Sequence, residues 1–408
     1  MLQNSDTVVV AGSSIAGMSA ARELRTCGFE GELVMLDRDH RAPYRRPEVS
    51  KGLLNGLISD EKVVIPWPET LGVRRIPGAE LTGLDHRLHT VTAGTADGGV
   101  ELQYSGLVIA TGSEPRRSPF PPLGGVHSLR TFADSEKFRG ELAGAQRVVI
   151  VGAGFIGLEV AYVASAMGKL VTVIEPQELP LAHILGAEMS TAILRLHESH
   201  GVRFHLGSQV EALEAGPGGD VERVLVGGGT EIKADIVLVA IGSVPSVGWL
   251  RDSGLSAERG VVCDAACAVV GAENVVAAGD VASWRNPLYG RLMRVEHWAH
   301  AIEQGTFAAR RLLGVHDPGG FAAAPYFWSQ QYGRRIQSVG SSTGYDHVEI
   351  LDPDPERLLV AYFRGGRLIS VAGLAAGPAI FKFRPLVLHG ADAGSVRGHQ
   401  DATRAKVA

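Results

Sequence analysis

The sequence predicts an α/β protein with two nucleotide-binding βαβ domains and a small α+β domain toward the C-terminal end. An apolar strand, a glycine-rich turn and a helix follow one another from residue 7, and the same order recurs from residue 147. The 408 residues exceed the roughly 100–200 that one domain usually holds, so several domains are expected. The 52 glycines favour nucleotide-binding turns over a helical bundle, because glycine lets backbone turn tightly and approach a ligand closely.

The first βαβ segment is TVVVAGSSIAGMSAARELRTCGFEGELVMLD, which ends at Asp37. A strand that enters a helix through a glycine turn points backbone N–H groups and the helix dipole at one spot, which suits a pyrophosphate. Asp37 follows Gly12 by about 25 residues, near the offset expected for a carboxylate that accepts from ribose hydroxyls. Ser14 replaces the middle glycine, which weakens the pattern without removing it. The expected cofactor-binding residues here are Gly12, Ser14, Ile15, Ala16, Gly17, Asp37 and Arg38.

The second βαβ segment, QRVVIVGAGFIGLEVAYVASAMGKLVTVIE, carries the full G-x-G-x-x-G pattern and ends at Glu175. A carboxylate there accepts from the 2′-hydroxyl of a ribose and repels a 2′-phosphate, and no arginine follows it closely, so NADH is favoured over NADPH. Two Rossmann-like segments in one chain indicate two dinucleotides, FAD and NADH. The expected residues of this half are Gly152, Gly154, Phe155, Ile156, Gly157 and Glu175, with Ile241 and Gly242 after the closing strand.

Composition excludes several partners. The net charge of −5 comes without a block of lysines or arginines, so nucleic acid is not expected. No apolar stretch reaches the roughly 20 residues that cross a bilayer, and no leader pattern precedes the first strand, which predicts a cytoplasmic protein without membrane contact. Three cysteines indicate a reducing compartment; Cys27 is expected to be a buried helix-end thiol, and Cys263 and Cys267 to be structural thiols. Metal-ligand spacing is absent from the sequence, so no metal is expected.

Further strings occur in a specific order: PYRRPEVSK, LVIATGSEPRR, LRTFAD, VVAAGDVA, RVEHWAHAIEQG and PYFWSQQYG. With them, the sequence from Thr7 to about Leu374 resembles the FAD-dependent ferredoxin reductases of bacterial oxygenase systems, which have the glutathione-reductase-like two-dinucleotide fold. The resemblance implies hydride transfer from NADH to FAD and then single-electron transfer to an iron–sulfur ferredoxin. That ferredoxin would feed a haem-thiolate monooxygenase or a Rieske-type oxygenase.

The resemblance also assigns residues to the cofactors. It implies that Lys51 and Glu159 meet beside the flavin and the nicotinamide as a catalytic pair, although a plain interface salt bridge is an equal alternative. The remaining implied FAD-binding residues are Arg46, Lys51, Ala110, Thr111, Gly112, Arg130, Gly279, Asp280, Glu296, His297 and Trp298. Of these, Arg130 could instead form a surface ion pair, and Trp298 could be an ordinary core residue.

The sequence departs from the family pattern at three places. Glu48 follows Pro47 where the family usually has a second proline, Gln330 replaces an acidic residue, and AAGPAIFKFRP replaces an asparagine–arginine–proline run. The last of these changes affects the C-terminal surface and therefore leaves the identity of the ferredoxin partner open. Paired arginines could form a local basic face, although such pairs are more often solvated surface: Arg74–Arg75, Arg310–Arg311 and Arg334–Arg335. Tyr326 and Trp328 could lie between flavin and partner, and a core role is an equal alternative for each.

The expected order of domains is residues 1–115 and 245–324 for the two parts of the FAD domain, 116–244 for the NAD domain, and 325–408 for a C-terminal domain whose tail after Gly390 is mobile. Two alternatives of the same fold stay open. One is an NADH oxidase or disulfide reductase, which the lack of cysteine between Arg38 and Arg75 disfavours. The other is a flavoprotein that senses NADH and signals through its interactions.

Overall fold

The computed structural model describes residues 2–67, 69–354 and 356–404. The chain divides into two compact units, each assembled from three segments. Unit 1 consists of Met1–Arg45, Val64–Glu114 and Ser243–Pro325, and unit 2 of Arg46–Val63, Pro115–Gly242 and Tyr326–Ala408. Each unit contains one five-stranded parallel sheet, and unit 2 also contains a five-stranded antiparallel sheet in its C-terminal part, which confirms the predicted fold class.

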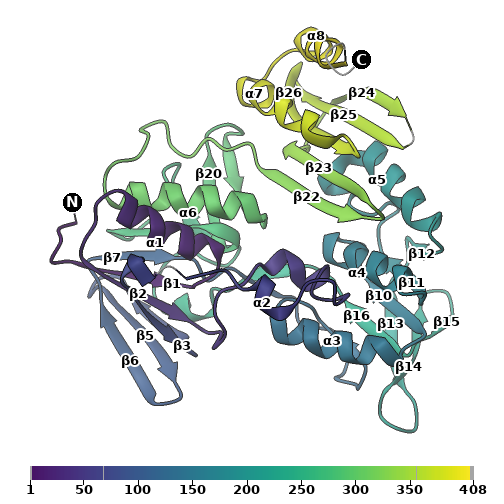
Figure 1. Cartoon of the computed structure of the whole chain (residues 1–408), viewed down its shortest axis with the longest axis horizontal. Coiled ribbons are helices and arrows are strands. Elements are labelled where there is room, and N and C mark those ends of the chain that lie inside the picture. Colours follow the sequence, from purple (N-terminus) through teal and green to yellow (C-terminus); the bar gives the residue numbers. More distant parts are fainter. Residues whose placement is uncertain (1, 68, 355, 405–408) are drawn as a thin grey trace. The chain divides into compact units, whose positions relative to one another are not determined.

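Unit 1 is built on a parallel sheet of order β19-β7-β1-β2-β3. Its strands are β1 (Thr7–Ala11), β2 (Glu32–Asp37), β3 (Val73–Pro77), β7 (Gly106–Ile109) and β19 (Val275–Ala277). Val8, Val9 and Val10 are fully buried, as expected for a parallel strand with both faces covered. Helices α1 (Ile15–Thr26) and α6 (Trp298–Leu312) lie side by side against this sheet (Figure 1). A Cβ atom on Gly305 would lie 2.3 Å from the carbonyl oxygen of Ala16, so glycine permits their close packing.

The rest of unit 1 consists of small antiparallel or mixed sheets and short turns. One sheet contains β4 (Glu80–Asp85), β5 (Thr90–Thr95) and β6 (Gly98–Gln103), and another contains β18 (Val261–Cys263), β20 (Ala282–Asn286) and β21 (Arg291–Met293). Strand β8 (Ser113–Pro115) pairs with β17 (Ser243–Pro245). The 3-10 turns are η2 (Glu69–Leu71), η3 (Gly248–Leu250) and η4 (Gly279–Val281).

Unit 2 has a second parallel sheet, of order β12-β11-β10-β16-β9. Its strands are β9 (Val126–His127), β10 (Arg147–Val151), β11 (Leu170–Glu175), β12 (Arg203–Leu206) and β16 (Ile236–Val239). Helices α3 (Phe132–Gly144), α4 (Phe155–Ala166) and α5 (Ala182–Glu198) belong to this part, with the short η1 (Arg46–Ser50) and α2 (Asp60–Val63). An antiparallel sheet of β13 (Val210–Ala215), β14 (Val221–Val226) and β15 (Thr230–Lys233) shares an apolar core with β10 and β16.

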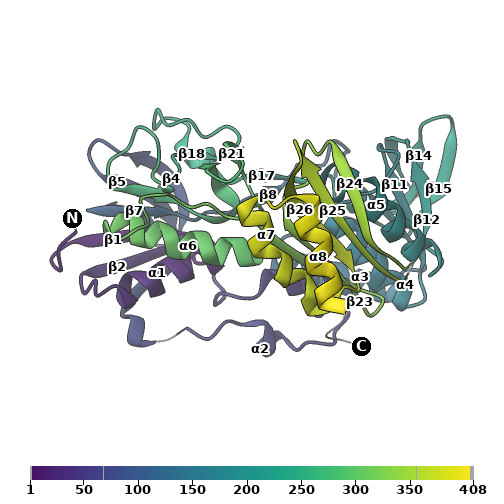
Figure 2. The same ribbon diagram turned by 90° about the horizontal axis from the view of Figure 1, so that it is seen from above.

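The C-terminal part of unit 2 is an antiparallel sheet of order β22-β23-β26-β25-β24. These strands are β22 (Tyr326–Gln331), β23 (Arg334–Gly340), β24 (His347–Asp354), β25 (Arg357–Arg364) and β26 (Arg367–Leu374). After them come η5 (Gly377–Phe383), α7 (Arg384–His389) and α8 (Ala393–Arg404), and the last two helices lie next to each other in both views (Figure 2).

Most of the tail after Gly390 forms helix α8, in which Val396, His399 and Gln400 share one face; Val396 is fully buried and the ring of His399 packs on Phe383. The mobility of this tail stays a prediction. One expectation from the sequence is wrong. Cys27 is exposed, because it caps the C-terminal end of α1 and does not lie on its buried face. No helix in the described part of the chain is both long and apolar enough to cross a bilayer.

Candidate dinucleotide sites and the Lys51–Glu159 pair

The two glycine turns have the same backbone geometry. Gly12 follows β1 with φ 113° and Gly152 follows β10 with φ 103°, a region that side chains disfavour. A Cβ atom at Gly12 would lie 2.3 Å from the carbonyl oxygen of Ala110, and one at Gly152 would lie 2.4 Å from that of Ala240. The third glycines, Gly17 and Gly157, are equally confined, since a Cβ would lie 1.9 Å and 2.2 Å from the preceding turn's carbonyl. Both turns therefore require glycine for backbone reasons.

The middle position of the second turn is open. A Cβ atom added to Gly154 would meet no protein atom within 4 Å, so the fold itself does not require glycine there. The first turn of α4, with Phe155 and Ile156, begins beside this glycine, and the backbone N–H groups of a helix N-terminus are suited to hold a phosphate. Ser14 has φ −72° and ψ −176°, against φ −73° and ψ 179° for Gly154. Serine therefore preserves the turn geometry before α1, which continues with Ile15 and Ala16.

The carboxylates at the two strand ends are oriented in different ways. Asp37 at the end of β2 accepts from Ser13 and forms an ion pair with Arg75 at 2.5 Å. Glu175 at the end of β11 accepts from the backbone N–H of Ala153 at 2.7 Å and of Gln177 at 3.0 Å. Backbone amides hold Glu175 beside its glycine turn without a basic side chain, which suits a ribose hydroxyl better than a ribose phosphate.

The other predicted FAD-binding residues of unit 1 follow β7 and β19. Thr111, between Ala110 and Gly112, donates its hydroxyl to the carbonyl of Ser246 at 2.9 Å. Asp280 accepts from the Ser113 hydroxyl at 3.1 Å, which brings the ends of both strands together. Gly279 and Asp280 belong to the 3-10 turn η4, which β20 follows directly.

Four more predicted residues of unit 1 lie at its surface or at the start of α6. Arg38 forms an ion pair with Glu114 at 2.5 Å. Glu296 accepts from Ser243 and Arg294. His297 precedes the first turn of α6, and Trp298 begins that helix with its side chain partly exposed.

Lys51 and Glu159 form a buried ion pair within unit 2. Lys51 Nζ lies 2.6 Å from Glu159 Oε1, and the two side chains are 15% and 5% exposed. The ammonium also donates to the carbonyl of Pro47 at 3.2 Å. Ser50 donates to Glu159 Oε2 and Ser329 donates to Oε1, each at 2.5 Å. The contact predicted from the sequence is present, whereas these two serines were missed; their only signal was their place in the PYRRPEVSK and FWSQQ strings.

Trp328 lies next to this ion pair, and further ring contacts are made by the same elements. Lys51 Nζ lies 5.7 Å from the ring centroid of Trp328, and the Arg335 guanidinium lies 5.9 Å from the same ring, so both cations interact with one indole. The rings of Phe155 and Phe327 are 3.8 Å apart. The structure thus joins the start of α4, the turn after η1 and the hairpin of β22 and β23.

Arg46 and Arg130 also meet in unit 2. The Arg46 guanidinium donates to the carbonyl of Arg130 at 3.4 Å. Arg130 directly precedes the capping box of α3, in which Thr131 and Asp134 exchange hydrogen bonds. Ile241 and Gly242 follow β16, and the Gly242 carbonyl accepts from the backbone of Arg116.

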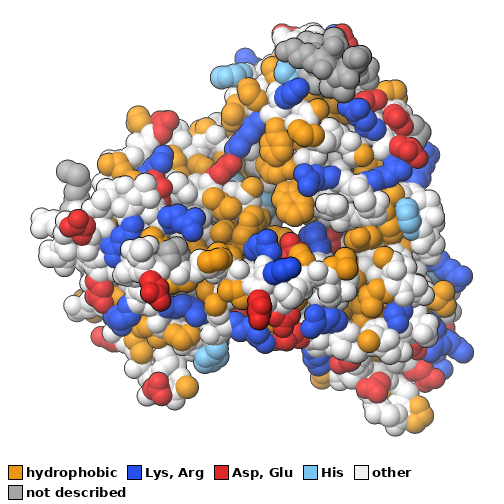
Figure 3. Space-filling view, viewed as in Figure 1, with side chains coloured by type: hydrophobic (Ala, Val, Ile, Leu, Met, Phe, Trp, Pro, Cys, Tyr) orange, Lys and Arg blue, Asp and Glu red, His pale blue; other side chains and the backbone are white. Residues whose placement is uncertain are grey.

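The paired arginines are largely neutralised by neighbouring acids. Arg74 pairs with Glu32 at 3.0 Å and Arg75 with Asp37, while Arg310 pairs with Glu23 at 2.5 Å and Arg334 with Glu356 at 3.3 Å. Basic and acidic side chains are interspersed over the face drawn in Figure 3. Four of these six arginines are therefore paired with acids.

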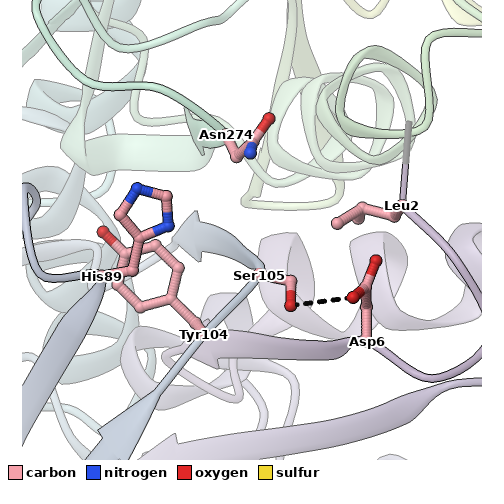
Figure 4. Close-up of a pocket in the computed structure, with 6 residues that line it drawn as sticks. All are labelled: Leu2, Asp6, His89, Tyr104, Ser105 and Asn274. Carbon is pink, nitrogen blue, oxygen red and sulfur yellow. Dashed lines mark hydrogen bonds between the residues drawn. The ribbon is translucent and has the colours of Figure 1, made fainter.

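A separate pocket of about 330 Å³ lies in unit 1 (Figure 4). It is next to the amino ends of β1, β7 and β19, whereas the glycine turn follows the carboxyl end of β1. It is thus distinct from the predicted dinucleotide site. Its lining residues are Leu2, Asp6, His89, Tyr104, Ser105 and Asn274. Across the described residues, no three His, Cys, Asp or Glu side chains are grouped as metal ligands would be.

Comparison with known proteins agrees with these features. The sequence profile of pyridine nucleotide-disulphide oxidoreductases matches residues 6–305, and that of the reductase C-terminal domain matches residues 326–406. The chain is 34% identical to the ferredoxin reductase subunit of a 5,5'-dehydrodivanillate O-demethylase from Sphingobium sp., over 94% of this chain and 93% of that protein. It is 33% identical to rhodocoxin reductase from Rhodococcus erythropolis, over 90% and 85% of the two chains. Its fold is similar to putidaredoxin reductase in a covalent complex with putidaredoxin, with a TM-score of 0.90, 28% identity and 98% coverage of both chains.

Proposed function

The chain belongs to the pyridine nucleotide-disulphide oxidoreductase family, and from that membership we propose that it is an FAD-dependent NADH:ferredoxin reductase. The observation that carries the proposal is the repeated turn: two strands, each followed by a sterically required glycine and a helix, with a carboxylate at the end of the next strand. One such turn holds one dinucleotide, so the chain has a place for an electron donor and for a flavin.

FAD supplies the step from two-electron to one-electron chemistry, because a flavin accepts a hydride and releases electrons singly. The residues that would hold it are the first glycine turn with Asp37, the segments with Thr111 and Asp280, and Arg46 and Arg130. Arginine suits this role because its planar guanidinium can bind phosphate oxygens through two hydrogen bonds.

The second glycine turn and Glu175 would hold NADH. The Glu175 carboxylate is already oriented by the amides of Ala153 and Gln177, so it can accept from a ribose 2′-hydroxyl without rearranging. A 2′-phosphate would be repelled by the same charge. We therefore include a preference for NADH in the proposal.

The Lys51–Glu159 pair serves the hydride-transfer step in this proposal. Lys51 supplies a positive charge in a largely dry environment, where a fixed charge acts more strongly than in water. Glu159 fixes the position of that charge, and the carbonyl of Pro47 directs a second ammonium hydrogen. A plain structural salt bridge is the competing role.

The physiological acceptor is proposed to be an iron–sulfur ferredoxin that supplies a haem-thiolate or Rieske-type oxygenase. A relative named as the ferredoxin reductase subunit of an O-demethylase and another named rhodocoxin reductase match 94% and 90% of this chain, and the C-terminal profile is present. The buried thiols give no support to a disulfide-reductase function, since burial raises the pKa of Cys263 to about 12. The free thiols are consistent with a cytoplasmic location, which we include in the proposal.

The test begins with the purified protein, which should be yellow and should lose its flavin absorbance when NADH is added without oxygen. NADH-driven reduction of a panel of ferredoxins, followed in oxygen-free buffer, then identifies the acceptor class. Fast oxygen consumption without ferredoxin would point to an oxidase, and a long-lived reduced complex that reduces no ferredoxin would point to a sensor. A protein that cannot take up FAD would contradict the proposal.

A further inference from the structure

A line of buried polar side chains continues from Glu159 into the interior of unit 2. Ser329, Gln331 and His197 are each fully buried. Ser329 Oγ lies 2.5 Å from Glu159 Oε1, Gln331 Nε2 lies 3.2 Å from Ser329 Oγ, and His197 Nε2 lies 2.7 Å from Gln331 Oε1. The line connects α4 and α5 with β22 of the C-terminal sheet.

The hydrogen bonds in this line have one direction. The Glu159 carboxylate can only accept, so the Ser329 hydroxyl must donate to it. The Ser329 oxygen then accepts from the Gln331 amide, which leaves the Gln331 carbonyl facing His197. A carbonyl oxygen only accepts, so His197 Nε2 must carry a proton. Every group therefore donates toward Glu159.

His197 is suited to the far end of this line. Complete burial lowers the pKa of its imidazole to about 4, so the ring is neutral near pH 7. With the proton on Nε2, Nδ1 accepts from the Tyr332 hydroxyl at 3.2 Å. The Tyr332 ring also stacks on His200 with centroids 3.9 Å apart, which restricts its position.

We propose that Ser329, Gln331 and His197 are positioning residues for the reductase reaction, which fix the Glu159 carboxylate and through it the charge of Lys51. Glu159 Oε1 is the atom that both Ser329 and Lys51 contact, so a displacement of this oxygen moves the ammonium as well. Aligned donors polarise one another, which strengthens the last hydrogen bond to the carboxylate. The inference rests on the proposed role of the Lys51–Glu159 pair in hydride transfer.

The experiment compares two variants of the line with a matched control. Ser329→Ala removes the donor next to Glu159 with the smallest change in volume, and Gln331→Met interrupts the line one residue further away at similar side-chain length. Ser370→Ala is the control, because Ser370 is a buried serine of the same sheet whose hydroxyl donates to the Val339 carbonyl outside the line. Each change is made in the wild-type protein and in Glu159→Gln, and flavin reduction by NADH is measured by stopped flow.

At saturating NADH, Ser329→Ala should slow flavin reduction by roughly tenfold and Gln331→Met by roughly threefold, with FAD content unchanged. Ser370→Ala should leave the rate within about twofold of wild type, as a change that does not touch the site. In the Glu159→Gln background the effect of Ser329→Ala should largely disappear, because the carboxylate that it positions is absent. Coupling of this kind would not arise from a general loss of stability.

A second readout does not depend on activity. Nitrogen-15 NMR of the histidine rings should show His197 neutral with its proton on Nε2 at pH 7, and Gln331→Met should loosen that tautomer preference. A protonated ring or an Nδ1–H tautomer in the wild-type protein would overturn the inference. Two kinetic results would also overturn the inference while leaving the role of the Lys51–Glu159 pair intact. One is that the effects of Ser329→Ala and Glu159→Gln on the rate are fully additive. The other is that Ser329→Ala and Gln331→Met are no slower than Ser370→Ala although Glu159→Gln is slow. A normal rate in Glu159→Gln would instead refute the role of the pair, and the inference with it.

Discussion

Replacing Lys51 with methionine tests the Lys51–Glu159 pair most directly. Methionine keeps most of the side-chain length and deletes the charge that lies 2.6 Å from the Glu159 carboxylate. A preorganised electrostatic contact is worth about 2.7–4 kcal/mol in the transition state, or roughly a hundred- to thousandfold in rate. Because the Lys51 side chain is 15% exposed, the expected loss is smaller, about ten- to a hundredfold in flavin reduction by NADH.

The same substitution also affects stability, and the two effects can be separated. Removing one member of a buried pair can cost about 3–5 kcal/mol, because the other charge is left without its partner. Ser50 and Ser329 still donate to Glu159, so the cost should lie at or below the lower end of that range. In the double variant Lys51→Met/Glu159→Gln the unpaired charge is gone. Stability should then recover in part while flavin reduction stays slow.

Stopped-flow reduction by NADH and urea unfolding measure the two quantities on the same samples, with FAD content determined for each. The two losses in rate should not add in the double variant, since the residues act as a unit. Unchanged reduction rates in both single variants with FAD fully bound would refute the reasoning and leave a structural salt bridge.

Three further perturbations test the nucleotide turns and the buried histidine. Glu175→Ala should narrow the preference for NADH over NADPH by roughly tenfold in kcat/KM, because the repulsive carboxylate is removed; a wild-type enzyme that already uses NADPH equally well would contradict this assignment. Gly154→Val should weaken NADH binding by at least about tenfold at unchanged melting temperature, since the new side chain enters open space. Gly152→Ala should instead destabilise the fold, because its Cβ would meet the carbonyl of Ala240. Equal losses of stability in the two variants would contradict these different roles of the two glycines. His197 has a pKa of about 4 in the folded state and about 6.5 in the unfolded state. Its contribution to the free energy of unfolding is therefore complete above pH 6.5. This contribution is lost as the pH falls toward 4, by up to about 1.4 kcal/mol per pH unit. Urea midpoints at pH 7.5 and pH 5 should therefore differ less in His197→Gln than in wild type, and equal differences would show that this ring does not titrate as described.

Much of the fold follows from patterns that are local in the chain. Gly12 and Gly152 each follow an apolar strand directly. Glycine is required at both positions because the turn has a positive φ and passes close to a neighbouring carbonyl oxygen. The same locality explains why Ser14 could be accepted in place of glycine, since it has the backbone angles of Gly154. The position of Glu175 could be predicted as well. Glu175 ends β11, which pairs with β10 in parallel, so it lies beside the glycine turn that follows β10.

Local patterns failed where an amphipathic face was weak or where a residue lay at an element's end. The face of α8 consists of Val396 with His399 and Gln400, which is a poor apolar signal in a polar segment. Cys27 is exposed because it lies one residue beyond the end of α1. The last residue of a helix cannot be predicted from sequence to within one residue, so the exposure of Cys27 could not be predicted either.

The sequence by itself determined the two glycine turns, the carboxylates that accompany them and the presence of Lys51 and Glu159, because strand, turn and helix signals are contiguous and backbone sterics are local. Only the tertiary structure decided what surrounds that pair. Ser329 is 170 residues from Glu159 in the chain, and Gln331 is 134 residues from His197, yet each pair is joined by a direct hydrogen bond. Such contacts depend on how the C-terminal sheet packs against α4 and α5 within unit 2, and the periodicity of a single segment carries no information about which distant side chain will meet it.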